Sequence, residues 1–131
     1  MSAHNNTSND PVLNQDLLDQ YRQRKSGLLG RLIEAFLTEA PDQFQNLRQG
    51  VEQKDSAQVR LGAHTLKSGS HNLGAVRLSA LCQDIENAVI DDDMECVGQL
   101  FAKLGPEFFE AEQALRGELA REQGRLETTP A

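Results

Sequence analysis

The chain has 131 residues, 25% of them charged, and a formal net charge of −7 at pH 7. This length corresponds to one domain, and a domain of this size buries enough surface to fold without a metal or a disulfide. The 13 basic residues are scattered, which excludes nucleic acid and an anionic membrane as partners because both require clustered Lys and Arg.

The two ends of the chain differ from its middle. Residues 1–11 are polar without apolar periodicity and are expected to form a disordered tail, and residues 122–131 are expected to fray. The predicted domain therefore covers residues 12–121. The N-terminus lacks the apolar core of a secretory signal, and no run of about 20 apolar residues is present, so we expect a cytoplasmic protein without a membrane span.

The two cysteines, Cys82 and Cys96, lie among apolar residues of predicted helices. This favours two reduced, packed thiols. A disulfide between them stays open at this point.

The first two helices follow from apolar spacing and from breaks in it. Asn14 can cap a short helix, which Ser26-Gly27 interrupts. A long helix is then predicted from about Leu28 to Gln53, because its apolar residues recur every three or four positions. Pro41 lies inside it and should kink or restart the helix, since proline removes one backbone hydrogen bond.

The third helix has signals at both ends. Asp55 or Ser56 can cap its start, and it is expected to end near Asn72, with Gly74 as the left-handed terminator.

Two further helices complete the domain. The fourth carries apolar residues from Val76 to Val89, and the acidic residues 91–93 can cap the last helix, which begins near Met94. Gly105-Pro106 should bend or split this last helix. Short connections between amphipathic helices make antiparallel neighbours, so the sequence predicts an all-α fold, an antiparallel four-helix bundle with a short extra N-terminal helix.

His64 is the residue with the strongest chemical signal. At about 100° per residue, Val59 and Leu66 fall on the core side of its helix, opposite His64. Lys67 lies one turn on, on the same outer face as His64. A neutral imidazole beside a cation suits nucleophilic attack on an activated phosphoryl group. The plain alternative is an ordinary surface histidine.

The rest of the sequence limits this chemistry. No glycine-rich nucleotide loop and no Walker-type lysine are present, so the chain is not expected to phosphorylate itself from ATP. Donor and acceptor must then be other proteins. His71 lies on the same face as His64, but seven residues apart is a poor spacing for two ligands of one metal.

The segments AHTLKSGS at residues 63–70 and NLGA at residues 72–75 resemble the histidine phosphotransfer (HPt) domains of bacterial phosphorelays. The resemblance covers about residues 14–118. It implies that His64 accepts a phosphoryl group, that Lys67 stabilises its charge, and that small residues admit the partner. Many members carry Gly directly after the Lys, whereas Ser68 comes first here and Gly69 second.

The same resemblance implies the partners. An HPt domain accepts a phosphoryl group from a receiver-domain aspartate and passes it to another receiver, so response-regulator receiver domains and a hybrid sensor kinase are the expected partners. Mg²⁺ belongs to the receiver, and no cofactor or metal is expected in this chain. The largely polar outer helix faces predict a monomer.

Further residues are assigned to contacts around His64. Gln83 and Glu86 on the neighbouring helix are expected to approach His64 and orient its ring. The predicted docking surface consists of Ala57, Arg60, Leu61, Ser68, Gly69 and His71.

Two other functions stay open. One is a docking scaffold for receivers or other signalling partners that carries no phosphate. The other is a ligand-binding helical enzyme, for which an inward polar cluster is missing.

Overall fold

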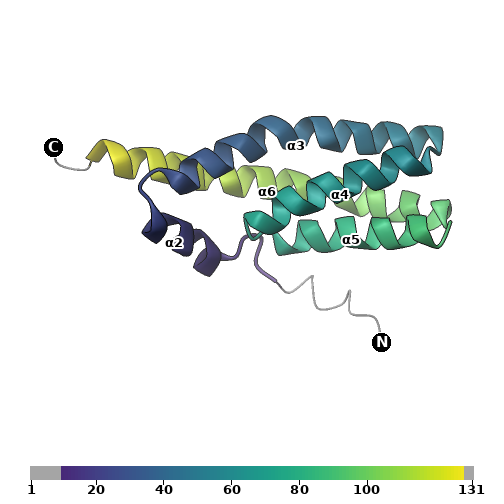
Figure 1. Ribbon diagram of the computed structural model, residues 1–131, viewed down its shortest axis with the longest axis horizontal. Helices are drawn as coiled ribbons and strands as arrows, with labels where there is room; N and C mark the ends of the chain where they lie inside the picture. Colours follow the sequence, from purple (N-terminus) through teal and green to yellow (C-terminus); the bar gives the residue numbers. More distant parts are fainter. Residues whose placement is uncertain (1–9, 129–131) are drawn as a thin grey trace.

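The computed structural model describes residues 10–128, and the regular structure of this part is entirely helical. Helices α3 to α6 form an antiparallel four-helix bundle, and α2 lies at one end of it (Figure 1). This confirms the predicted fold. The helices are α2 (Gln15–Arg24), α3 (Leu28–Gln53), α4 (Ser56–Asn72), α5 (Val76–Ile90) and α6 (Met94–Thr128).

The helix boundaries follow from capping residues. Asn14 caps α2, Asp55 caps α4 and Asp93 caps α6, and each side chain accepts a hydrogen bond from the backbone N–H three residues later. After α4, Gly74 adopts a φ of 71°, a left-handed conformation that strains other residues. These signals were present in the sequence and place the bundle corners where they were predicted.

Helices α3 and α4 pack closely because glycines face the contact. A Cβ atom at Gly50 would lie 2.9 Å from the backbone N of Val59, and one at Gly62 would lie 3.2 Å from the backbone N of Leu47. The buried core includes at least one residue from every helix. Its largest fully buried side chains are Leu18, Leu29, Ile33, Leu47, Leu66, Leu78, Ile85, Leu104, Leu115, Val59, Val97 and Cys82.

The two prolines inside helices do not divide them. Pro41 lies within α3 and Pro106 within α6, and each helix continues on both sides. Of the bend or split predicted at Gly105-Pro106, the split is therefore wrong, and the bend stays a prediction. Leu104 and Phe108, on either side of Pro106, are both buried, and this packing offsets the backbone hydrogen bond that the proline removes.

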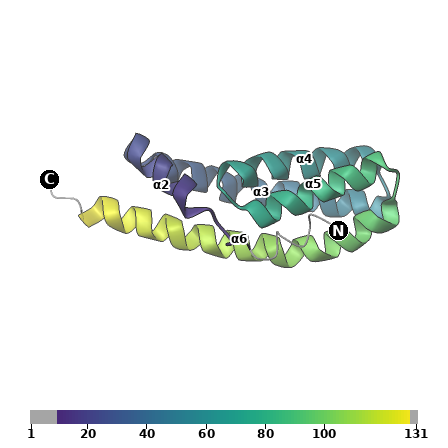
Figure 2. The ribbon, with the colours of Figure 1, turned by 90° about the horizontal axis from the view of Figure 1, so that it is seen from below.

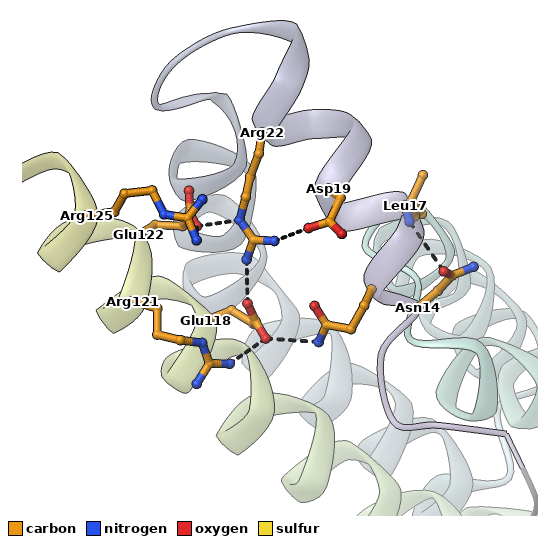
Figure 3. Close-up of polar contacts among 9 residues, drawn as sticks. Asn14, Leu17, Asp19, Arg22, Glu118, Arg121, Glu122 and Arg125 are labelled. Carbon is orange, nitrogen blue, oxygen red and sulfur yellow. Dashed lines mark hydrogen bonds and ion pairs between the residues drawn. The ribbon is translucent and has the colours of Figure 1, made fainter. Parts of the chain in front are cut away.

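The C-terminal end differs from the prediction. The domain was expected to end at residue 121, but α6 continues to Thr128 and extends beyond α4 and α5 (Figure 2). Near this end of α6, Glu118 and Glu122 are buried and pair with Arg22 of α2, at 2.6 Å and 2.5 Å (Figure 3). Glu122 therefore packs with the folded domain, and the helix continues through residues that were expected to fray.

The N-terminal prediction is tested only in part, since residues 1–9 of the proposed tail lie outside the described residues. The carbonyl of Asp10 accepts a hydrogen bond from Arg77 at 3.3 Å. Both cysteines are free thiols. No helix within residues 10–128 combines the length and apolar character that a membrane span requires.

Candidate functional site

His64 lies in the middle of α4, and its side chain is 61% exposed. Val59, Ala63 and Leu66 of the same helix are buried on the opposite side. The structure thus places the imidazole on the outer face that helical periodicity indicates, where a second macromolecule can reach it.

Helix α5 runs beside α4 and brings a carboxylate to the ring. The Oε2 atom of Glu86 lies 3.2 Å from Nδ1 of His64, and the Glu86 side chain is only 10% exposed. A carboxylate can only accept a hydrogen bond, so this contact stabilises the tautomer with its proton on Nδ1. The lone pair is then on Nε2, on the side of the ring away from Glu86.

The same carboxylate also holds Lys67. The Lys67 Nζ atom lies 2.6 Å from Oε1 of Glu86 and donates a hydrogen bond to Oε1 of Gln83 at 2.9 Å. Gln83 in turn donates to Asn87 at 3.0 Å. Of the two α5 residues expected near the imidazole, Glu86 contacts it, whereas Gln83 contacts Lys67. One carboxylate therefore positions both the imidazole and the ammonium group.

The surroundings of Glu86 keep it charged. Burial alone would raise the pKa of its carboxyl, but hydrogen bonds and positive charge from Lys67 and His64 outweigh burial and lower this pKa. Cys82 is buried one turn earlier in α5, and burial, followed by the negative charge of Glu86, raises the pKa of its thiol to about 12. The thiol therefore stays protonated and weakly nucleophilic at neutral pH.

The exposed residues around His64 form two different flanks. On one side, Ala57, Arg60 and Leu61 line a shallow hollow together with His64. On the other side, a polar hollow is lined by Lys67, Ser68, His71, Asn72, Ser79, Ala80 and Gln83. Five of the six predicted docking residues thus border one of these two hollows.

Gly69 is the exception among the predicted docking residues. A Cβ atom at Gly69 would lie 3.2 Å from the Phe36 ring of α3, and Gly69 lines a groove of about 200 Å³ between α3 and α4. The neighbouring Ser70 is buried, and its hydroxyl donates to the carbonyl of Leu66 at 2.8 Å. Gly69 therefore lies against the Phe36 ring, and Ser70 packs in the interior of the bundle. The sequence held this signal, since Gly69 lies about 140° around the helix from His64.

The site combines an exposed imidazole with one negatively and one positively charged side chain. The lone pair of an exposed imidazole, with a cation beside it and a carboxylate behind it, suits reversible attachment of an anionic group. Within residues 10–128, no group of three or more His, Cys, Asp or Glu side chains is placed to hold a metal ion.

Comparisons with known proteins agree with this arrangement. The model of the Hpt domain family matches residues 31–125. Histidine-containing phosphotransfer protein B from Pseudomonas aeruginosa PAO1 shares the fold, with a TM-score of 0.80, 22% identity, and coverage of 85% of this chain and 96% of that protein. The HPT domain of a sensor hybrid histidine kinase from Shewanella has a TM-score of 0.73 and 25% identity, with coverage of 84% and 95%.

No curated protein sequence matches the chain. The family model nevertheless covers most of the chain, from the first turn of α3 almost to the end of α6. The chain therefore belongs to the Hpt domain family, the histidine phosphotransfer proteins of phosphorelays.

Proposed function

We propose that His64 carries the phosphoryl group, which it accepts from the aspartyl phosphate of one receiver domain and passes to the aspartate of another. The observation that supports this is the exposed imidazole whose Nδ1 faces Glu86. The Nε2 lone pair attacks phosphorus, the bond from phosphorus to the aspartate oxygen breaks, and the aspartate leaves as a carboxylate. The acceptor aspartate reverses these steps.

Glu86 and Lys67 have separate roles in this transfer. Because Nδ1 keeps its proton during the attack, the ring becomes cationic, and the adjacent Glu86 carboxylate stabilises that charge. The Lys67 ammonium offsets negative charge on the phosphoryl oxygens. Since Glu86 contacts both groups, they are positioned before the donor arrives, which lowers the entropic cost of the reaction.

The partner supplies the rest of the chemistry. We assign no kinase activity of its own to the chain, place the required Mg²⁺ in the receiver domain, and expect a cytoplasmic monomer. A hybrid sensor kinase is the proposed source of the phosphoryl group, and the likeness to the Shewanella HPT domain supports that choice.

Transfer of radioactive phosphate tests the proposal. A receiver domain labelled with ³²P on its aspartate is mixed with the wild-type chain, with His64→Gln and with His71→Gln. Label is expected on the wild-type chain and on His71→Gln, whose substituted residue is exposed on the same helix, but not on His64→Gln. Equal labelling of His64→Gln would refute the carrier role. Tight receiver binding by the wild type without any labelled intermediate would instead establish the docking scaffold.

A further inference from the structure

The carboxylate of Glu86 contacts the His64 ring from a position that is largely shielded from water. Its Oε2 atom lies 3.2 Å from Nδ1 of the ring, and the Glu86 side chain is only 10% exposed. Water weakens a charge interaction less in such a position than at an open surface. The contact therefore has its main effect on one property of the ring, the proton on Nδ1.

This proton determines how easily a phosphoryl group leaves the ring. When the bond between phosphorus and Nε2 breaks, its electron pair stays on Nε2. A ring that carries the Nδ1 proton then leaves as neutral imidazole, whereas a ring without it must leave as an imidazolate anion. Imidazolate is a much stronger base and a much poorer leaving group. The protonated ring is therefore the form that releases its phosphoryl group.

The charged groups around the ring act on this proton in opposite directions. Glu86 favours the protonated ring, because it accepts the Nδ1 hydrogen bond and its charge stabilises a cation. Lys67 and Arg60 of α4 oppose it. The Lys67 ammonium, however, lies 2.6 Å from the second Glu86 oxygen, and Arg60 is exposed, so that water and salt screen its charge. The direct contact with Glu86 therefore dominates.

Glu86 itself stays charged where the ring changes its protonation. Burial alone would raise the pKa of its carboxyl, but hydrogen bonds and charge from Lys67 and His64 outweigh burial and hold this pKa below its ordinary value. The neighbouring thiol of Cys82, with a pKa of about 12, stays protonated. Loss of a proton from the loaded site between mildly acidic and mildly alkaline pH is therefore assigned to the ring.

We propose that Glu86 holds the proton on Nδ1 of phosphorylated His64 through the neutral and mildly alkaline range, so that the carrier keeps its phosphoryl group in the form that can leave. Glu86 is then a positioning residue for a proton as well as for the ring. This inference rests on the proposed phosphoryl transfer to His64. It adds that onward transfer continues at a pH where free phosphohistidine has already lost its ring proton.

Magnetic resonance of the loaded carrier tests the inference. Phosphoramidate loads the wild-type chain as Nε2 attacks phosphorus, the phosphorus–nitrogen bond of the donor breaks and ammonia leaves. The ¹⁵N signal of Nδ1 and the ³¹P signal then follow loss of the ring proton from about pH 6 to about pH 9, with free Nε2-phosphohistidine as the reference. The midpoint is expected about one pH unit or more above that of the free compound. An equal or lower midpoint would overturn the inference.

Glu86→Gln separates the charge of the side chain from its shape, since the amide oxygen still accepts a hydrogen bond. Its midpoint is expected to fall by about one pH unit. The pH above which loss of the phosphoryl group to water slows is expected to fall with it, each rate being taken relative to that chain's own rate at about pH 6. In this loss water attacks phosphorus and Nε2 keeps the electron pair. Glu34→Gln, at an exposed position of α3, changes the net charge equally and is expected to match the wild type.

The outcomes distinguish this inference from the carrier role. If phosphoramidate fails to label His64 in the wild type, both are refuted. If it labels His64 but the pH profile of Glu86→Gln equals that of the wild type, only the inference is refuted. The comparison of the wild type with free phosphohistidine does not depend on the folding of any variant.

Discussion

At the scale of single residues, Glu86 determines the geometry of the site. Its nearly buried carboxylate is shared between the imidazole of His64 and the ammonium of Lys67. Removing the side chain would leave both partners without their common anchor, and a buried network loses more than one contact when such a member is lost. The orientation of the nucleophile and the position of the cation therefore depend on one side chain.

We expect Glu86→Gln to separate orientation from charge. The amide oxygen still accepts a hydrogen bond from Nδ1, but it no longer offsets the positive charge of the phosphorylated ring. Transfer from a labelled receiver is expected to slow by about tenfold or more, the size expected for a lost bond to a charged group. Asn87→Ala is the control, because Asn87 contacts Gln83 and not His64. A wild-type rate in Glu86→Gln would contradict the role of its charge.

Single-residue signals in the sequence identified part of this site. Helical periodicity was sufficient to put His64 and Lys67 on one exposed face, because both belong to the same helix. The division of labour between Glu86 and Gln83 depends on the register of α5 against α4, which a one-helix pattern does not contain. The contact of Gly69 with Phe36 was not foreseen, because helix propensity shows only that a position tolerates a small residue and not which group lies against it. Its role in docking stays a prediction.

At the scale of helices, glycines determine how closely α3 and α4 approach. The closest neighbour of a Cβ atom built at Gly50 would be backbone, the N of Val59 at 2.9 Å. Backbone cannot rotate away as the end of a side chain can. A larger residue at this position must therefore separate the two helices.

Gly50→Ala is expected to destabilise the fold by roughly 1–3 kcal/mol, the usual cost of overpacking. Gly98 in α6 provides the matched control, since a Cβ atom there meets nothing within 4 Å. Gly98→Ala is expected to stabilise the chain by about 0.5–1 kcal/mol through better helix propensity. Urea unfolding of both variants measures the difference, and changes of the same sign would show that the contact at Gly50 does not limit the packing.

The extent of each helix was predictable where a local signal existed. Capping by Asn14, Asp55 and Asp93 is encoded within three residues, so these starts could be predicted. Pro106 suggested a break because its local cost is known, whereas the burial of the flanking apolar residues that offsets this cost comes from other helices.

At the scale of the whole molecule, a charged cluster joins the beginning and the end of the domain. Arg22 of α2 contacts Asp19, Glu118 and Glu122, and Arg121 pairs with Glu118 (Figure 3). Burial alone would raise the pKa of Glu118, but hydrogen bonds from Gln15 and Arg121, the Arg121 charge and the Arg22 hydrogen bond outweigh it and lower the pKa. The charged form is thus the one that the fold stabilises.

We expect Arg22→Met to lower the free energy of unfolding by about 2–3 kcal/mol at pH 7, because two buried carboxylates lose a partner. The lowered pKa of Glu118 means that this stabilisation is complete above the unfolded-state pKa of about 4.3 and disappears as pH falls through the folded-state pKa. The two chains should therefore converge in stability in acid, which urea unfolding across pH measures. Asp19→Asn, at an exposed partner, is expected to cost less than about 1 kcal/mol. An effect of Arg22→Met that persists unchanged below the folded-state pKa would contradict this account.

The predicted fraying from residue 122 shows what sequence patterns miss at this scale. Glu122 lies in a polar stretch of the sequence, where no local pattern marks it as a buried residue. Its partner Arg22 is 100 positions away in the chain. The pair forms because α2 packs against α6, and a sequence pattern does not contain this arrangement. The bundle itself was predictable, because the apolar spacing of each helix is repeated over many residues.

The hydrogen bond between Nδ1 of His64 and Glu86 has a consequence for signalling. A phosphoryl group on Nε2 occupies the opposite side of the ring, so loading and unloading leave this bond and the backbone of α4 in place. Under the proposed transfer to His64, we therefore expect the empty and the loaded carrier to share one backbone conformation. A partner would then distinguish the two states by the added phosphoryl oxygens.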